Sequence, residues 1–170
     1  MARLRKNCAY RRLERAYTRI SKYRKKSFVR SRPNIVISRY EMGNGKAKFD
    51  NEMFLVAKGN IQIRHNALEA ARQTANRLLE RTFGKENYFF KLLVFPHHIL
   101  RENPLAAGAG ADRLSTGMKM SFGKTIATAA RVYEGQRIYQ VKYNDKTKAD
   151  VVKKALERAS KKLPVKCSVL

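Results

Sequence analysis

A Gly-Lys-Thr triplet at residues 123–125 is the strongest nucleotide-binding signal in this sequence of 170 residues. In a P-loop, another glycine stands five positions before the Gly-Lys pair, so that backbone N–H groups can cradle the phosphates. Met118 occupies that position, and Gly117 is one residue out of register. The spacing therefore argues against a P-loop.

A second glycine pattern begins at Gly108 and Gly110, as in the G-x-G-x-x-G motif that binds a dinucleotide pyrophosphate. Arg113 stands at the place of the third glycine, and the preceding stretch lacks the composition of a strand. We therefore predict no dinucleotide site, and no cofactor of any kind.

Histidines and cysteines are the remaining candidates for catalysis or metal binding. His97 and His98 are adjacent, so in an extended segment they point in opposite directions, and no acidic or Cys cluster accompanies them. His65 has no Ser or Cys beside it in sequence that would suggest a nucleophile and its base. Cys8 and Cys167 lie near opposite termini, which favours reduced thiols over a disulfide. We predict no metal site, no catalytic residue and no enzyme activity.

The net charge points to a different kind of chemistry. Lys and Arg number 38 against 13 Asp and Glu, which gives a formal charge of +25. Self-repulsion at this charge opposes folding, and binding to a polyanion relieves it. An anionic membrane would call for a basic amphipathic helix or an apolar run of about 20 residues, and the sequence shows neither. We predict a nucleic-acid partner, no membrane association and a cytoplasmic location.

Much of this charge lies at the start of the chain. Residues 1–33 contain thirteen Lys or Arg and one acid, Glu14, a formal charge of +12. Aromatic side chains that can stack on exposed bases interleave with these cations: Tyr10, Tyr17, Tyr23 and Phe28. A disordered solubilising tail and an Arg-rich transit peptide are the alternatives. We favour an RNA-binding extension over 1–33 that becomes ordered on RNA, followed by a single domain over 34–170.

The elements that must position these residues alternate in type along the chain. Runs of β-branched and other apolar residues predict strands over 35–40 and 53–56, separated by a Gly-Asn-Gly turn. A helix is predicted from a cap at Asn60 to Gly84, with an apolar stripe at Leu68, Ala71, Ala75 and Leu78 or Leu79. Its opposite face presents His65, Glu69, Arg72 and Asn76, which predicts a surface that faces either solvent or RNA.

The second half of the chain repeats this mixture. An apolar run closed by Pro96 predicts a central strand over 88–95, and the Gly-rich composition of 101–117 predicts a long loop. Strands over 125–132 and 137–143 are expected to pair as a hairpin through Glu134-Gly135. A capping box of Thr147 and Asp150 predicts a last helix that Pro164 ends. The predicted class is α+β, with a mixed or antiparallel sheet and two main helices.

Several blocks of sequence resemble one family in the same order. They are IQIRHNALEAAR at 61–72, GKENY at 84–88, PHHILREN at 96–103, GAGADRL at 108–114 and TGM at 116–118. These blocks resemble the ribosomal protein L-sixteen family, and in particular its archaeal and eukaryotic branch, called ten-e. The basic opening and Ala129-Ala130-Arg131-Val132 extend the likeness over nearly the whole chain, with Pro104 as a departure where the family usually has Lys.

The resemblance implies an α+β fold with a hammerhead-like strand arrangement and a structural role in the large ribosomal subunit. The implied partners are large-subunit rRNA, with 5S rRNA as a further candidate, neighbouring ribosomal proteins and, transiently, tRNA. It also implies that a flexible loop at about 102–115 points toward the tRNA acceptor arms. We expect its tRNA-proximal residues to be Arg101, Glu102, Asn103, Gly108, Ala109, Gly110, Asp112 and Arg113.

The predicted rRNA contacts are cations, aromatic rings and histidines from both parts of the chain. They are Arg3, Arg5, Lys6, Tyr10, Arg11, Arg12, Arg15, Tyr17, Arg19, Lys22, Tyr23, Arg24, Lys25, Lys26, Arg64, His65, Arg72, His97, His98 and Lys124. The alternative function is a free RNA-binding architectural or tRNA-handling factor, and a third hypothesis is an RNA-modifying enzyme.

Overall fold

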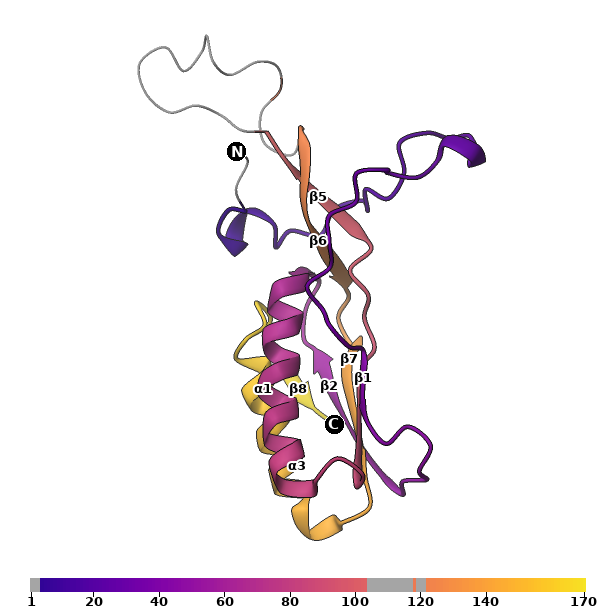
Figure 1. Cartoon of the computed structure of the whole chain (residues 1–170). Helices are drawn as coiled ribbons and strands as arrows, with labels where there is room; N and C mark the ends of the chain where they lie inside the picture. The colour runs from indigo at the N-terminus through magenta and orange to yellow at the C-terminus, as the bar shows by residue number, and fades with distance from the viewer. Residues whose placement is uncertain (1–3, 104–117, 119–121) are drawn as a thin grey trace.

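Two long strand pairs form the backbone of the molecule. The computed structural model describes residues 4–103, 118 and 122–170. Strands β2 (Asn51–Ala57) and β3 (Ile61–Arg64) run antiparallel to β7 (Arg137–Tyr143) and β6 (Lys124–Val132) respectively. The four strands therefore make one bent ribbon that extends through both of the sheets (Figure 1).

The ribbon bends where both of its strands are interrupted, at 58–60 and 133–136. There the Ala57 N–H donates to the Gln136 carbonyl at 3.0 Å, and the Glu134 N–H donates to Asn60 Oδ1 at 2.9 Å. Gly135 turns with a φ of 77°, a value that favours glycine. These bonds replace the ladder at the bend, so the chain passes from one sheet to the other with these backbone groups paired.

Further strands pair with each half of the ribbon and complete the two sheets. The large sheet has the order β1-β4-β7-β2-β8, with β1 at Glu41–Gly43, β4 at Tyr88–Leu92 and β8 at Cys167–Val169. The small sheet has the order β3-β6-β5, with β5 at His98–Glu102. Every strand pair in the described residues is antiparallel.

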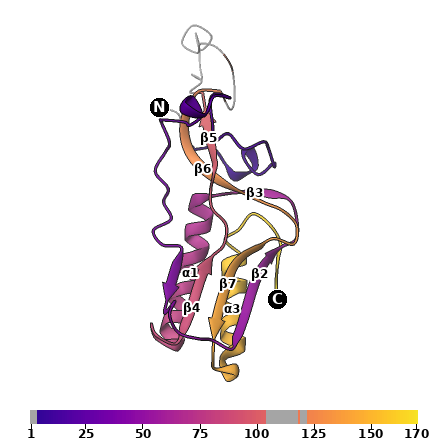
Figure 2. The same ribbon diagram turned by 90° about the vertical axis from the view of Figure 1, so that its right-hand side faces the viewer.

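Helices α1 (His65–Phe83) and α3 (Ala149–Ser160) lie side by side on one face of the large sheet (Figures 1 and 2). Leu68 and Leu79 of α1 are fully buried, and the Tyr139 hydroxyl of β7 donates to the Leu68 carbonyl at 2.6 Å. Gly84, with a φ of 74°, ends α1. The predicted α+β class with two main helices is confirmed.

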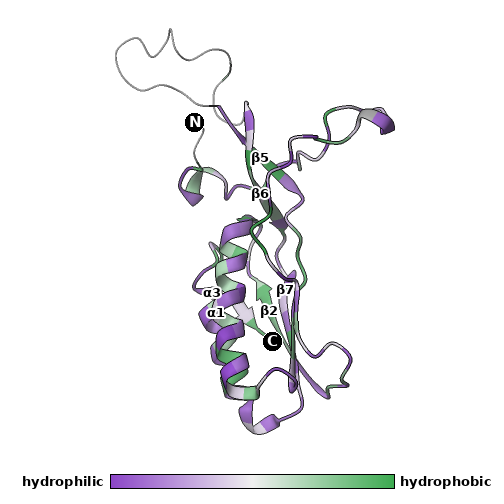
Figure 3. Ribbon diagram, viewed as in Figure 1, coloured by the Kyte–Doolittle hydropathy of each residue, from purple (hydrophilic) through white to green (hydrophobic). Residues whose placement is uncertain are grey.

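The first forty residues are mostly irregular, apart from 3-10 turns η1 (Asn7–Ala9) and η2 (Arg24–Lys26). Residues 4–17, called here the docked segment, contact the small sheet. Residues 18–33 are called the basic arm and are drawn mostly in the purple of hydrophilic residues (Figure 3). Most of the arm projects away from the small sheet (Figure 1), and its end returns to β6, where Thr125 Oγ1 donates to the Ser31 carbonyl. Contacts with the sheets therefore begin well before residue 33, where we placed the domain boundary.

Three predictions for the first half are wrong. Residues 35–40 form no strand, because they lie along α1, where the Val36 N–H donates to His65 Nδ1 at 3.0 Å. The helix does not begin after Asn60, because residues 61–64 form β3 and pair with β6. The helix face expected to be exposed is also largely covered, since His65, Glu69 and Arg72 are buried.

Three predictions for the second half need correction. The strands β6 and β7 do not pair as a hairpin, because the bend sends them into different sheets. The central strand stops at Leu92 instead of residue 95. Arg101 and Glu102, which we assigned to the long loop, belong to β5, and residues 104–117 of that predicted loop lie outside the described residues. Strands β3, β5 and β8 were not predicted.

The last helix is confirmed, but its predicted cap is wrong. The Thr147 N–H donates to the Asp145 side chain, and this contact opens the 3-10 turn η3 (Lys146–Lys148) ahead of α3. The residue before α3 is Lys148, which makes no side-chain capping bond. The capping side chain is therefore that of Asp145, and not that of Thr147 as predicted.

Candidate nucleic-acid interface

The docked segment is tied to the small sheet by its backbone. The Gln62 N–H donates to the Arg11 carbonyl and the Ile99 N–H to the Tyr17 carbonyl, both at 3.0 Å. The Tyr10 ring packs into a small apolar cluster with Leu100 and neighbouring alanines of β6. The segment thus covers the small sheet as an added layer.

Glu102 anchors the start of this segment. Its carboxylate is buried and accepts hydrogen bonds from Arg5 and from the Tyr10 hydroxyl, the latter at 2.9 Å. Burial raises the pKa of Tyr10, so the phenol keeps its proton and remains a donor. Glu102 was predicted to be a tRNA-proximal loop residue, but the structure places it in this internal contact.

Two histidines hold the N-terminal chain through neutral rings. His98 Nδ1 accepts the Tyr17 N–H at 2.7 Å, and His65 Nδ1 accepts the Val36 N–H. Burial lowers the pKa of both imidazoles, which keeps these nitrogens unprotonated and able to accept. Both were predicted to contact RNA. Their rings are instead buried against the chain's own backbone, while His97 is exposed.

Arg72 is also bound within the protein. Its guanidinium donates to both carboxylate oxygens of Glu69, at 2.6 and 2.8 Å, and to Ser38 Oγ at 3.0 Å. The hydrogen bond from Arg72 is the largest cause that lowers the pKa of Glu69 to about 2. This pair joins α1 to the chain just before β1, so Arg72 has its charge satisfied internally.

Most of the other predicted rRNA contacts lie at the surface. The exposed ones are Arg5, Lys6, Arg11, Arg12, Arg15, Arg19, Lys22, Tyr23, Arg24, Lys25, His97 and Lys124, whereas Tyr17 and Arg64 are half-buried and Tyr10 is buried. Arg3 and the side chain of Lys26 lie outside the described part of the chain. The structure thus gathers most of these cations in the docked segment and the basic arm.

The predicted tRNA-proximal loop is described only at its base. Arg101 lies in β5, with its guanidinium 3.8 Å from the centre of the Tyr17 ring, and Asn103 follows β5. Gly108, Ala109, Gly110, Asp112 and Arg113 lie outside the described residues.

The basic arm has an unusual balance of charges and contacts. It contains seven Lys or Arg among sixteen residues and no acid. The hydrogen bonds recorded for residues 18–30 join near neighbours, such as Ser27 Oγ to the Arg24 carbonyl at 2.8 Å. Its exposed aromatic rings, Tyr23 and Phe28, lie near Lys22 and Arg30. Cations and rings are therefore available to a partner.

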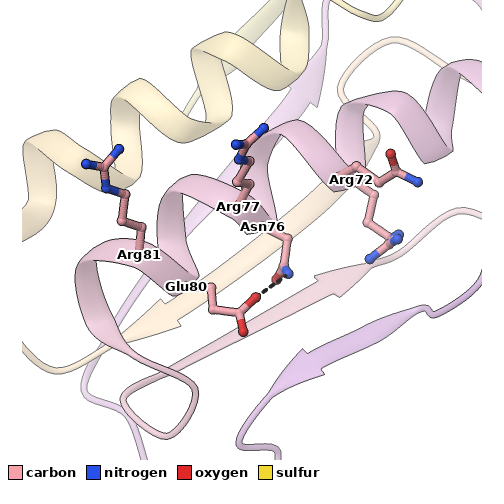
Figure 4. Close-up of a pocket in the computed structure, with 6 residues that line it drawn as sticks. Arg72, Asn76, Arg77, Glu80 and Arg81 are labelled. Atoms are coloured by element: carbon pink, nitrogen blue, oxygen red, sulfur yellow. Dashed lines mark hydrogen bonds between the residues drawn. The ribbon is translucent and has the colours of Figure 1, made fainter.

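A second basic surface, missed in the sequence, lies where α1 and α3 meet. Figure 4 shows Arg77 and Arg81 directed toward α3, away from the side where Asn76 and Glu80 bond to each other. With Arg158 of α3 they line a groove of about 500 Å³. None of these three arginines is within ion-pair distance of an acid in the described residues. Only the i, i+4 spacing of Arg77 and Arg81 could have indicated this surface.

Metal-binding clusters and membrane-spanning helices are absent from the described residues. No three His, Cys, Asp or Glu side chains gather there to hold a metal ion, and no helix there is long and apolar enough to cross a membrane. Cys8 and Cys167 are both free thiols.

Comparisons with known proteins agree on one family. The family model described as ribosomal protein L16p/L10e matches residues 18–170. The large ribosomal subunit protein uL16 of Methanococcus maripaludis strain C7 is 46% identical over 148 residues, which cover 87% of this chain and 85% of the relative. The same-named protein of Picrophilus torridus is 47% identical over 158 residues, with 92% and 89% covered. That of Nanoarchaeum equitans is 42% identical over 168 residues, with 96% and 90% covered.

Proposed function

Because the chain belongs to the ribosomal protein L16p/L10e family, we propose that it is a structural constituent of the large ribosomal subunit that binds rRNA. Its relatives are named for that subunit and not for an enzyme activity. The basic arm carries this proposal, since its sequence contains seven cations and no acid, and those whose side chains are described pair with no acid in the described residues. Neighbouring ribosomal proteins and 5S rRNA are further proposed partners.

The basic arm and the helix groove play different parts in this proposal. The arm combines cations with exposed rings, a pairing that suits unpaired RNA as well as phosphates. The groove of Arg77, Arg81 and Arg158 offers planar guanidinium groups without rings, which suits the backbone of an RNA helix. His65 and Arg72 are left out of the proposed interface because they are buried and bonded internally.

The salt dependence of rRNA binding tests the role of the arm. Each phosphate neutralised contributes about −0.9 to the slope of log K against log salt. We expect the fourfold change Arg19→Gln, Lys22→Gln, Arg24→Gln and Lys25→Gln to reduce the magnitude of the slope by about 3 to 4 on purified large-subunit rRNA.

A matched control removes the same charge from exposed lysines at the opposite end of the molecule: Lys46→Gln, Lys48→Gln, Lys85→Gln and Lys146→Gln. We expect this control to change the slope by less than about 1. Equal flattening by both variants would show that total charge, and not the arm, determines affinity.

We further propose that residues 104–117 reach the tRNA acceptor arms. The resemblance of residues 108–114 to the family supports this role, as do the described residues on either side, because β5 ends and β6 begins at the end of the small sheet remote from the large sheet (Figure 1). Replacement of 104–117 by a short Gly-Ser linker is expected to leave subunit association intact and to weaken tRNA binding by the reconstituted subunit. Unchanged tRNA affinity would contradict the proposal.

A further inference from the structure

The two ends of the basic arm are held at one pair of strand residues. Just before the arm, the centre of the Tyr17 ring lies 3.8 Å from the Arg101 guanidinium, and the Tyr17 carbonyl accepts the Ile99 N–H. Near the end of the arm, the Ser31 carbonyl accepts a hydrogen bond from Thr125 Oγ1. Arg101 and Thr125 are cross-strand partners in β5 and β6. The arm is therefore a loop that the small sheet closes at a single place.

The docked segment reaches this place along one face of β5. Successive side chains of a strand point to opposite faces, so His98, Leu100 and Glu102 share a face. His98 accepts the Tyr17 N–H, Leu100 packs against the Tyr10 ring, and Glu102 accepts the Tyr10 hydroxyl at 2.9 Å. Every second residue of β5 thus contacts the docked segment, and Glu102 holds its beginning.

Glu102 is an acid beside a strongly basic part of the chain, where a negative charge weakens attraction to a polyanion. Its buried carboxylate instead binds the Arg5 guanidinium, while the Arg5 carbonyl accepts a hydrogen bond from Arg64 at 2.7 Å. Release of the docked segment would open the loop that the arm forms. A longer, open segment loses more conformational entropy when it becomes ordered on a ligand.

We propose that Glu102 is a positioning residue for RNA binding, which keeps the basic arm closed and preorganised by holding the docked segment on β5. An arm held at both ends loses less freedom on binding, and bound rRNA stabilises the docked segment in return. This inference rests on the proposed function, because the ligand of the arm is the rRNA.

The substitution Glu102→Gln separates positioning from charge, because the two effects have opposite signs. It removes a negative charge, so charge attraction alone predicts equal or tighter binding of the full chain to purified large-subunit rRNA. The positioning role predicts binding about fivefold weaker, at the lower end of typical coupling between sites. Equal or tighter binding would overturn the proposal.

A matched control removes the same charge far from the small sheet. Glu41→Gln breaks an exposed ion pair with Lys91 at the edge of the large sheet. We expect this control to bind rRNA as tightly as the parent chain or slightly more tightly. A loss of affinity equal to that of Glu102→Gln would overturn the positioning role.

Two further variants leave the net charge unchanged and cover the case in which Glu102→Gln does not fold. Tyr10→Phe deletes the hydroxyl that donates to Glu102, and Thr125→Val deletes the hydroxyl that donates to Ser31. We expect each to weaken rRNA binding about twofold or more, because each removes one hydrogen bond that closes the arm. Unchanged affinity in both variants would overturn the proposal.

Hydrogen exchange at the Ile99 amide measures docking directly, because this N–H donates to the Tyr17 carbonyl. We expect faster exchange in Glu102→Gln than in the parent chain, and slower exchange in the parent once rRNA is bound. Salt-dependent rRNA binding by the parent with no loss of affinity in the variants would overturn the positioning role alone. No rRNA binding by the parent would overturn the proposed function, and this inference with it.

Discussion

At the scale of single residues, burial decides which polar groups remain available to a partner. The sequence places His65, Glu69 and Arg72 along one line of a helix, and helical spacing was compatible with a solvated or an RNA-facing side. The chain before β1 lies over that line and turns it into an internal network. No local pattern around these helix residues indicates that they are covered, because the segment that covers them lies about thirty residues earlier in the chain. The cations of the arm were easier to predict, because charge density is a property of the sequence itself.

The Glu69–Arg72 pair leads to a prediction about acid stability. Arg72 holds the pKa of Glu69 at about 2, below its usual 4.5, so the stabilisation is complete above pH 4.5 and is lost as the pH falls toward 2. The difference corresponds to about 3 kcal/mol in the free energy of unfolding. We expect Glu69→Gln to lower that free energy by about 3 kcal/mol at pH 7, because Arg72 stays buried without its carboxylate.

Urea denaturation at pH 7 and at several values between 5 and 2.5 measures both parts of this prediction. Glu69→Gln should lose less stability on acidification than the parent does. The control Glu134→Gln changes an exposed carboxylate on the turn between β6 and β7 and should behave like the parent. An acid dependence of Glu69→Gln identical to that of the parent would contradict the assignment.

At the scale of elements, the two helices and strands β2, β4, β6 and β7 could largely be predicted, because each has a local apolar pattern. The short strands β3, β5 and β8 could not. β3 reads as the start of a helix, and its three buried residues, Ile61, Gln62 and Ile63, do not alternate because the docked segment covers their second face. The pairing of β6 and β7 was predicted wrongly because a turn containing Gly135 usually indicates a hairpin, whereas here it bends a ribbon.

The edge of the large sheet depends on one glycine. Gly43 has a φ of 81°, and a Cβ atom there would lie 2.1 Å from the Tyr88 carbonyl oxygen of β4. Gly135 has a similar φ of 77°, but nothing lies within 4 Å of its Cβ position. We expect Gly43→Ala to cost about 3 kcal/mol or more in the free energy of unfolding, and Gly135→Ala only about 1 kcal/mol. Thermal denaturation of both variants measures the two losses of stability. Equal losses would show that the close approach of β1 to β4 does not determine the effect of the Gly43 substitution.

At the scale of the whole molecule, the apolar core and the segments that carry the exposed cations lie mostly in different parts of the fold. The large sheet with α1 and α3 holds most of the apolar core, to which Ile61, Ile63 and Val132 of the small sheet also contribute. The small sheet carries the docked segment, the basic arm and the strand ends that flank residues 104–117 (Figure 1). A charge of +25 on 170 residues is balanced most simply by a polyanion, and the proposed rRNA supplies it. Net charge and the order of the family-like sequence blocks made this partner predictable from sequence. The groove of Arg77, Arg81 and Arg158 was not predictable, because it depends on the packing of α1 against α3.

Sucrose-gradient sedimentation of the tagged chain from a cell lysate, before and after a high-salt wash, tests the central claim most directly. We predict recovery with the large subunit at low salt, and partial release at high salt because screening weakens exposed charge contacts. Recovery only in ribosome-free fractions at low salt would contradict the proposed function and favour a free RNA-binding factor.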